Sequence, residues 1–297
     1  MSPRPRRVRF DWSDTKVAFI PDDVFTSHVI NVLSLLLPAG ERWFCRIYNK
    51  ALPLVRDEQL AADVRGFIGQ EATHARAHAD LLEHFRARGI DTRDLTDEAE
   101  LLFGYLLGDE PFGIHLASGV TERPWLSFRV GLIAAIEQFT CDLGTWVLEA
   151  KSLDEAGADP TMLDLLRWHG AEEVEHRTVA FDLYQHLSGS YGGRVLHMSL
   201  TFPALLAVWI RSTRFLLKVD PAARPLFRRS IVHGLIRFEQ SARDRATLPP
   251  FSRLFAAARR YLARDFHPSR EGAPELAADY LARSPSIVRN TGFVGAA

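Results

Sequence analysis

Apolar residues recur every three to four positions along most of the chain, the spacing that places them on one face of an α-helix. No stretch shows the sustained two-residue alternation of a half-buried strand. The pattern therefore predicts an all-α protein. The stripes, and the Pro and Gly residues that end them, predict helices at 22–36, 41–49, 58–88, 125–151 and 161–187, with a break at Pro38-Ala39-Gly40, shorter pieces near 98–107, and Arg-rich amphipathic helices at 222–246 and 250–266.

Three polar residues interrupt the apolar stripe of the helix predicted at 161–187. His169, Glu173 and His176 stand at positions i, i+4 and i+7, so they project from one face. Apolar residues continue this face on both sides, which predicts that it is buried: Leu165, Leu166, Val179, Ala180, Leu183 and Leu187. A buried carboxylate between two buried imidazoles needs a counter-charge, and a metal ion provides one.

A second predicted helix repeats the pattern, with Glu71 and His74 three residues apart in an apolar stripe. Each Glu-x-x-His pair has a lone Glu in an apolar helix upstream, Glu41 before Glu71 and Glu137 before Glu173. One Glu from each of two helices and Glu-x-x-His from each of two others is the pattern of ferritin-like dinuclear carboxylate proteins. We therefore predict a ferritin-like four-helix bundle with additional N- and C-terminal helices.

The predicted metal ligands are Glu41, Glu71, His74, Glu137, His169, Glu173 and His176. Glu71 and Glu173 are expected to bridge two ions, because each shares a helix with its own histidine. Four carboxylates carry about −4 and two divalent ions +4, so the loaded core would be near neutral. Two iron ions suit nitrogen and carboxylate ligation, with manganese, a mixed manganese and iron pair, and zinc as alternatives. A buried polar network without metal is the other interpretation.

Four further residues are expected to support the ligands from outside the coordination sphere: His78, Cys45, Cys141 and Glu172. His78 follows His74 by one helical turn and is a further candidate ligand, while His169 could instead be a satisfied core histidine. Each cysteine lies four residues after a predicted ligand, and small core residues are the alternative interpretation for both. The matching offsets indicate two copies of one helical hairpin.

Composition and charge give information on the partners and the cellular compartment of the protein, but not on its reaction. With 36 basic and 37 acidic residues, a net charge of −1 gives no attraction to nucleic acid. The chain has two cysteines, and its first 16 residues are polar and Arg-rich, without the apolar run of a signal peptide. We therefore expect a cytoplasmic, reducing setting.

The region after the predicted bundle contains an apolar segment, at 195–217. Its uncharged part, from Met198 to Ile210, is about 13 residues long and contains Pro203, which is shorter than a membrane-spanning helix. A helix packed on the bundle, a peripheral contact with a membrane or hydrophobic partner, and a span are the three interpretations. The predicted organisation is a flexible basic arm at 1–20, the di-metal bundle at 21–190, additional helices of the same domain at 191–284, and a tail at 285–297.

The motifs around the predicted ligands resemble those of the bacterial family of predicted metal-dependent hydrolases. The resemblance extends over most of the chain and is carried by Leu37-Pro38-Ala39-Gly40-Glu41, by residues 67–78, by residues 173–182, and by Phe266-His267-Pro268. The His-x-x-x-Glu-x-x-His motif is also similar to that of the p-aminobenzoate N-oxygenase group of di-iron enzymes. That resemblance implies a third imidazole ligand at His169.

These observations give three function hypotheses. The first is a di-iron carboxylate enzyme that activates O2 to oxidise or oxygenate a small, hydrophobic organic substrate, with an electron donor of unknown identity. The alternative is a dinuclear metal-dependent hydrolase, as the family resemblance implies. The third is a non-catalytic iron-binding protein. No nucleic-acid partner is expected, and a homodimer is a candidate assembly.

Overall fold

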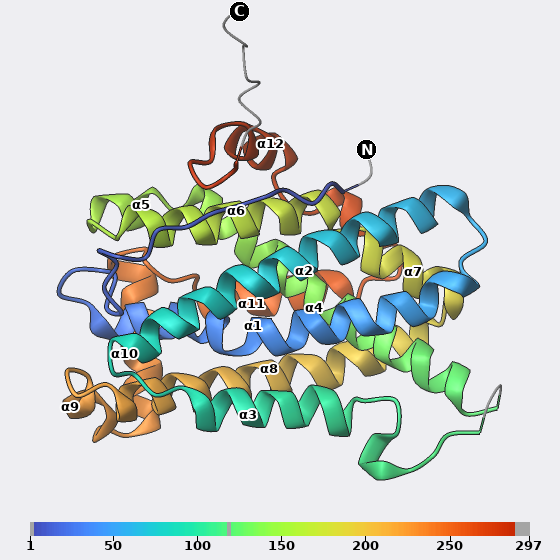
Figure 1. The fold of residues 1–297 in the computed structure, drawn as a ribbon, viewed down its shortest axis with the longest axis horizontal. Helices are drawn as coiled ribbons and strands as arrows, with labels where there is room; N and C mark the ends of the chain where they lie inside the picture. The colour runs from blue at the N-terminus through green and yellow to red at the C-terminus, as the bar shows by residue number, and fades with distance from the viewer. Residues whose placement is uncertain (1–2, 118–119, 289–297) are drawn as a thin grey trace, which may run out of the picture.

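The computed structural model describes residues 3–117 and 120–288, and it confirms an all-α fold for this part of the chain (Figure 1). The long helices are α1 (Val24–Ala51), α2 (Glu58–Ala87), α4 (Glu122–Glu149), α6 (Pro160–His176) and α8 (Tyr191–Val219). The shorter ones are α3 (Arg93–Leu101), α5 (Lys151–Glu155), α7 (Val179–Leu187), α9 (Arg224–Phe227), α10 (Ile231–Asp244), α11 (Phe251–Tyr261) and α12 (Pro274–Arg283). Single turns of 3-10 or π-helix lie at Leu52–Leu54, Leu102–Leu106, Pro111–Gly113 and Pro268–Arg270.

Helix α1 runs without interruption through Pro38, so the predicted break there is wrong. Asp23 caps the helix by accepting a hydrogen bond from the backbone N–H of Thr26. Proline removes one backbone donor and normally breaks a helix interior. Here both flanking turns are buried in the core, with Leu35 before Pro38 and Trp43 after it, and their packing outweighs the lost hydrogen bond. Glu41 consequently lies in the middle of a long helix.

Two other predicted helices are each divided. Helix α6 begins where expected, with Pro160 in its first turn and the Asp159 side chain accepting from the backbone N–H of Met162. It ends at His176, however, and a short turn separates it from α7. The single helix predicted at 222–246 is likewise two helices, α9 and α10.

Helices α1, α2, α6 and α4 form a closed ring, in which each contacts the next. The backbones of α4 and α6 approach each other closely, since a Cβ atom on Gly144 would lie only 2.8 Å from the Cα atom of Gly170. Only glycines permit this backbone-to-backbone crossing. The ring encloses the buried polar side chains described below, while its relation to ferritin-like proteins stays a prediction.

The remaining elements cover the outside of this ring. Helix α8 packs on α1 and α4, α11 packs on α4, and α12 packs on α6 on the opposite side of the molecule from α8 (Figure 1). The N-terminal arm was predicted to be loosely ordered, but residues 3–20 lie across α2 and α6. Phe10 contacts Trp168, and Val8 forms an isolated bridge with Ile287. The predicted tail lies outside the described residues from 289 onward.

Helix α8 is much longer than the apolar segment that predicted it. Its 29 residues continue through Pro203, and length and composition alone would allow either α8 or the region 24–54 to cross a membrane. The apolar window of the 24–54 region is 78% buried in the protein, as expected of a core helix, whereas only 22% of the window in α8 is buried. Much of the apolar surface of α8 is therefore left uncovered by the other residues that the structure describes.

Candidate metal centre

The structure brings all seven predicted ligands together inside the helix ring. They come from α1 (Glu41), α2 (Glu71 and His74), α4 (Glu137) and α6 (His169, Glu173 and His176). All are buried, and the most exposed retains only 7% of its accessible surface. They form two groups, and within each group the ligand atoms lie within 4.8 Å of one another. One group is Glu41, His74 and His169, and the other is Glu71, Glu137, Glu173 and His176. Two neighbouring sets of donors are what a dinuclear site requires.

Glu173 faces both groups at once. Its Oε1 atom lies 2.8 Å from His169 Nε2 and 3.5 Å from His74 Nδ1, whereas its Oε2 atom lies 3.2 Å from His176 Nε2. Glu71 also reaches both groups, with Oε1 at 3.5 Å from His74 Nδ1 and 3.4 Å from His176 Nε2. These two positions are those expected of bridging carboxylates, although their role as ligands stays a prediction.

The other two carboxylates each approach a single histidine. Glu41 Oε1 lies 3.5 Å from His169 Nε2, and Glu137 Oε2 lies 3.2 Å from His176 Nε2. This placement is the one expected of terminal carboxylates, each serving a single ion.

Outer contacts fix which nitrogen of two histidines faces the centre. The Nε2–H group of His74 donates to Glu172 Oε2 at 3.0 Å, which leaves the Nδ1 lone pair directed at the carboxylates. The Gln70 amide donates its own N–H to Glu175, so its oxygen accepts from His176 Nδ1–H at 3.1 Å and His176 presents Nε2. Metal-binding histidines usually have such a partner on the second ring nitrogen, because it sets the tautomer and the ring orientation.

The third histidine is supported by a chain of two residues. His169 Nδ1 lies 2.7 Å from His78 Nε2, and His78 Nδ1 lies 2.9 Å from Ser34 Oγ. In the tautomer that would bind a metal ion, His169 Nδ1–H donates to His78 and His78 Nδ1–H donates to Ser34, which directs the Nε2 lone pair of His169 at the centre. Burial lowers the pKa of His169 to about 4, and burial also lowers that of His78, so both rings are neutral at pH 7.

The N-terminal arm contributes a charge to this outer layer. Arg6 donates to Glu172 and to Glu175, each at 2.8 Å. The sequence predicted a supporting role for Glu172 but none for Arg6, Gln70 and Ser34. Their role depends on contacts between segments far apart in the chain, and no spacing within one helix indicates it.

The cysteines lie outside both groups of candidate ligands. The Cys45 thiol donates to the backbone oxygen of Ile68 at 3.5 Å, and Cys141 is buried in the hydrophobic core. Burial raises the pKa of Cys45 to about 12 and raises that of Cys141 as well, so both are protonated thiols at pH 7. This geometry favours the interpretation of both as small core residues.

The cluster of candidate ligands contains an excess of buried negative charge. Burial, followed by repulsion from neighbouring carboxylates, raises the pKa of Glu41 and Glu71 well above the usual range, and burial with the Glu173 charge raises that of Glu137 to about 7. Burial also raises the pKa of Glu173, but His176 and two hydrogen bonds outweigh it and hold that pKa well below the usual value. A cation among these groups would remove the repulsion.

The hydrogen bonds of the cluster leave suitable metal donors unused. Among the described residues, both oxygens of Glu41, both oxygens of Glu137, one oxygen of Glu71 and the Nδ1 atom of His74 are buried without a hydrogen-bond partner. Glu137 Oε2 is close to His176, but the contact does not have hydrogen-bond geometry. Buried polar atoms are rarely left unpaired in proteins unless an ion or another group binds them. The residues present therefore fit a pair of metal ions.

Comparison with known proteins agrees with this chemistry. A family model described as predicted metal-dependent hydrolase matches residues 4–272, which is most of the chain. The chain belongs to this family. No curated protein and no solved structure matches it. The family match extends over the helix ring, the outer helices α8 to α11 and nearly all of the N-terminal arm.

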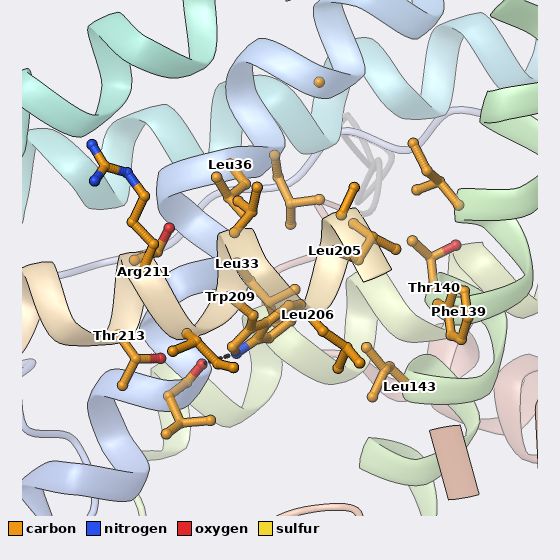
Figure 2. Close-up of a pocket in the computed structure, with 18 of the residues that line it drawn as sticks. Leu33, Leu36, Phe139, Thr140, Leu143, Leu205, Leu206, Trp209, Arg211 and Thr213 are labelled. Atoms are coloured by element: carbon orange, nitrogen blue, oxygen red, sulfur yellow. Dashed lines mark hydrogen bonds between the residues drawn. The ribbon is translucent and has the colours of Figure 1, made fainter. Parts of the chain in front are cut away.

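In this family member, a cavity of about 640 Å³ adjoins the metal centre. Figure 2 shows its walls, with Leu33 and Leu36 from α1, Leu143 from α4, and Leu206 and Trp209 from α8 pointing into one space. Five of the candidate ligands also line it: Glu41, Glu71, Glu137, His169 and Glu173. The cavity is therefore an apolar chamber with a polar end formed by candidate metal ligands.

Proposed function

We propose that this protein is a dinuclear metal-dependent hydrolase that acts on a small molecule with an extended apolar part. The observation that carries the proposal is the shared wall between the metal centre and the apolar cavity. The family description supports the reaction class, and the apolar lining supports the substrate class. A carbonyl or ester group would lie at the polar end, with its hydrocarbon part along α1, α4 and α8.

The seven clustered residues would hold two ions. Glu41, His74 and His169 would serve one of them, Glu137 and His176 the other, and Glu71 and Glu173 both. Bound there, divalent ions would supply Lewis-acid chemistry, which polarises a carbonyl oxygen and lowers the pKa of water.

The protein itself orients the centre and limits access of water. Glu172 and Gln70 hold the protons on the outer nitrogens of His74 and His176, so that neither ring can turn. The leucine and aromatic side chains of the cavity exclude bulk water, which strengthens every electrostatic interaction at its polar end. Thr140 donates its hydroxyl to the backbone oxygen of Glu137 and lines the cavity nearby.

Oxygen activation by an iron pair is a second candidate function, favoured by the donor set. Four glutamates and three histidines come from helices alone, and this nitrogen and carboxylate ligation suits iron. A dry, apolar cavity would also protect reactive oxygen chemistry from water.

One set of measurements separates these functions. The purified protein is loaded anaerobically with iron, manganese or zinc, and the metal content is determined. Turnover of nitrophenyl esters from acetate to laurate then tests hydrolysis, while O2 uptake and the visible spectrum of the iron form test oxygen activation. We expect about two metal ions per chain and faster ester turnover as the acyl chain lengthens.

Glu137→Gln should lose bound metal and turnover, whereas Glu122→Gln is a matched control on the exposed start of the same helix. Rapid O2 uptake without ester turnover would reject hydrolysis in favour of oxygen activation. Metal binding with neither reaction would indicate a non-catalytic metal-binding protein. Loss of neither metal nor turnover in Glu137→Gln would reject the centre itself.

A further inference from the structure

The outer surface around α8 and α10 carries large apolar side chains that face solvent. On α8, Leu200 and Ala204 are exposed, and on α10 Ile231, Val232 and Ile236 retain 49%, 64% and 52% of their accessible surface. Leu200, Ala204 and Ile231 also line the cavity, so the cavity reaches the surface beside both helices. We name this area, with the arginines described next, the mouth surface. Large exposed apolar patches usually mark an interaction site.

Basic residues lie directly beside these apolar side chains. Between Pro221 and Phe238 the chain contains four arginines and no acidic residue. Arg237 pairs with Asp23, but Arg224, Arg228 and Arg229 are exposed and form no ion pair with any carboxylate in residues 3–117 or 120–288. The mouth surface therefore combines unpaired positive charge with exposed hydrocarbon.

The placement of two of these arginines calls for a nearby anion. Arg228 and Arg229 immediately precede Ser230, which caps the N-terminus of α10 by accepting from His233 N–H. Cations at the positive end of a helix dipole are unfavourable unless an anion lies close to them. A phosphate group beside α10 would satisfy both the arginines and the helix end.

We propose that the mouth surface docks on an anionic phospholipid bilayer. Arginines beside a helix whose first two turns expose Ile231, Val232 and Ile236 are the features of an interfacial helix, which inserts its apolar side between lipid headgroups while its cations bind phosphates. A second copy of this chain fits the surface less well, because a two-fold interface places the same basic patch on both sides.

Docking would place the cavity opening against the hydrocarbon of the bilayer. An apolar substrate could then pass between α8 and α10 to the polar end of the cavity without crossing water. This delivery step rests on the proposed function, whereas docking itself depends only on the mouth surface. Vesicle binding should consequently be the same with and without bound metal, so failure of the metal chemistry and failure of docking are distinguishable.

Vesicle sedimentation of the full-length protein tests the proposal. The probes are phosphatidylcholine vesicles with and without phosphatidylglycerol. We expect binding to the anionic vesicles only, falling about 30-fold in Arg228→Gln/Arg229→Gln, since each cation near the surface contributes about fivefold. Val232→Ser/Ile236→Ser should lower binding at least tenfold, because two exposed apolar anchors are removed. Both pairs are exposed, so the variants should fold, which circular dichroism checks.

Controls on other faces of the molecule make the test specific. Arg46→Gln/Arg65→Gln removes two exposed arginines of α1 and α2, and Leu276→Ser removes an exposed apolar residue of α12, and neither should change binding. Equal binding to both kinds of vesicle, or no binding by the folded protein, would overturn the proposal. A dimer in sedimentation velocity that Val232→Ser disrupts, without vesicle binding, would assign the surface to a second copy. Resistance of bound protein to alkaline carbonate would indicate a span instead.

Discussion

Replacing Glu172 by Gln tests whether the outer carboxylate controls metal affinity through His74. In the structure Glu172 accepts a hydrogen bond from His74 Nε2–H at 3.0 Å and pairs with Arg6 at 2.8 Å. The Gln side chain has the same shape, and its amide oxygen can still accept this hydrogen bond. The substitution removes the negative charge, however. That charge makes the His74 imidazole a stronger electron donor toward a metal ion, so its loss should weaken metal binding.

The expected effect is large because solvent cannot replace the lost charge. The side chains of Glu172 and His74 are both 0% exposed. Loss of such a supporting partner typically lowers metal affinity 10- to 100-fold, about 1.4 to 2.7 kcal/mol. Complete burial places Glu172→Gln toward the upper end of this range.

Competition with a coloured chelator measures the affinity of the folded variant directly. Glu175→Gln is the comparison variant, because Glu175 also pairs with Arg6 at 2.8 Å but supports a histidine, His176, only through Gln70. It should lose much less metal affinity than Glu172→Gln. Equal losses of affinity in the two variants would show that Glu172 acts on metal binding through Arg6 rather than through His74. Unchanged affinity in Glu172→Gln would refute the supporting role altogether.

Three further predictions test the centre and the cavity. The Glu137 pKa of about 7 lies above the ordinary value of 4.5, so the metal-free protein should lose about 1 kcal/mol of stability in urea between pH 6.5 and 8, as the folded carboxyl ionises, and metal should abolish this loss. Unchanged stability across this window would contradict the repulsion described for the cluster. His169→Ala should lower the affinity for the metal ion near Glu41, and an unaltered metal content and iron spectrum would exclude His169 as a ligand. Leu206→Trp should fill part of the cavity and slow laurate ester turnover more than acetate, whereas Leu101→Trp on the exposed side of α3 should change neither.

The clustering of the candidate ligands could be predicted because it follows from spacing within single helices. His169, Glu173 and His176 share one face by the period of the helix, and Glu71 and His74 share another. The neighbouring apolar residues identify both faces as buried. Since a buried carboxylate needs a counter-charge, the two faces were expected to meet, and the structure places them within the same helix ring.

Contacts between distant segments were not predictable in this way. Arg6 lies 166 residues from Glu172, and its position in a basic N-terminal segment is typical of a solvated tail. Gln70 and Ser34 have no sequence feature that distinguishes them from other polar residues of buried helices. The hydrophobicity of the α8 segment is visible in the sequence, whereas its partial exposure depends on how α1, α4, α9 and α11 pack against it.

The uninterrupted course of α1 explains how the metal centre and the cavity are joined. Ser34 and Glu41 are seven residues apart, so both face the ring interior, where Ser34 supports His78 and Glu41 approaches His169. Leu33 and Leu36 lie on the adjoining face of the same helix and line the cavity. A break between Ser34 and Glu41 would let the two faces rotate independently and would separate the support of His169 from the carboxylate beside it. Helix α1 must therefore continue through Pro38 if its candidate ligand and its cavity-lining residues are to keep a fixed orientation relative to each other.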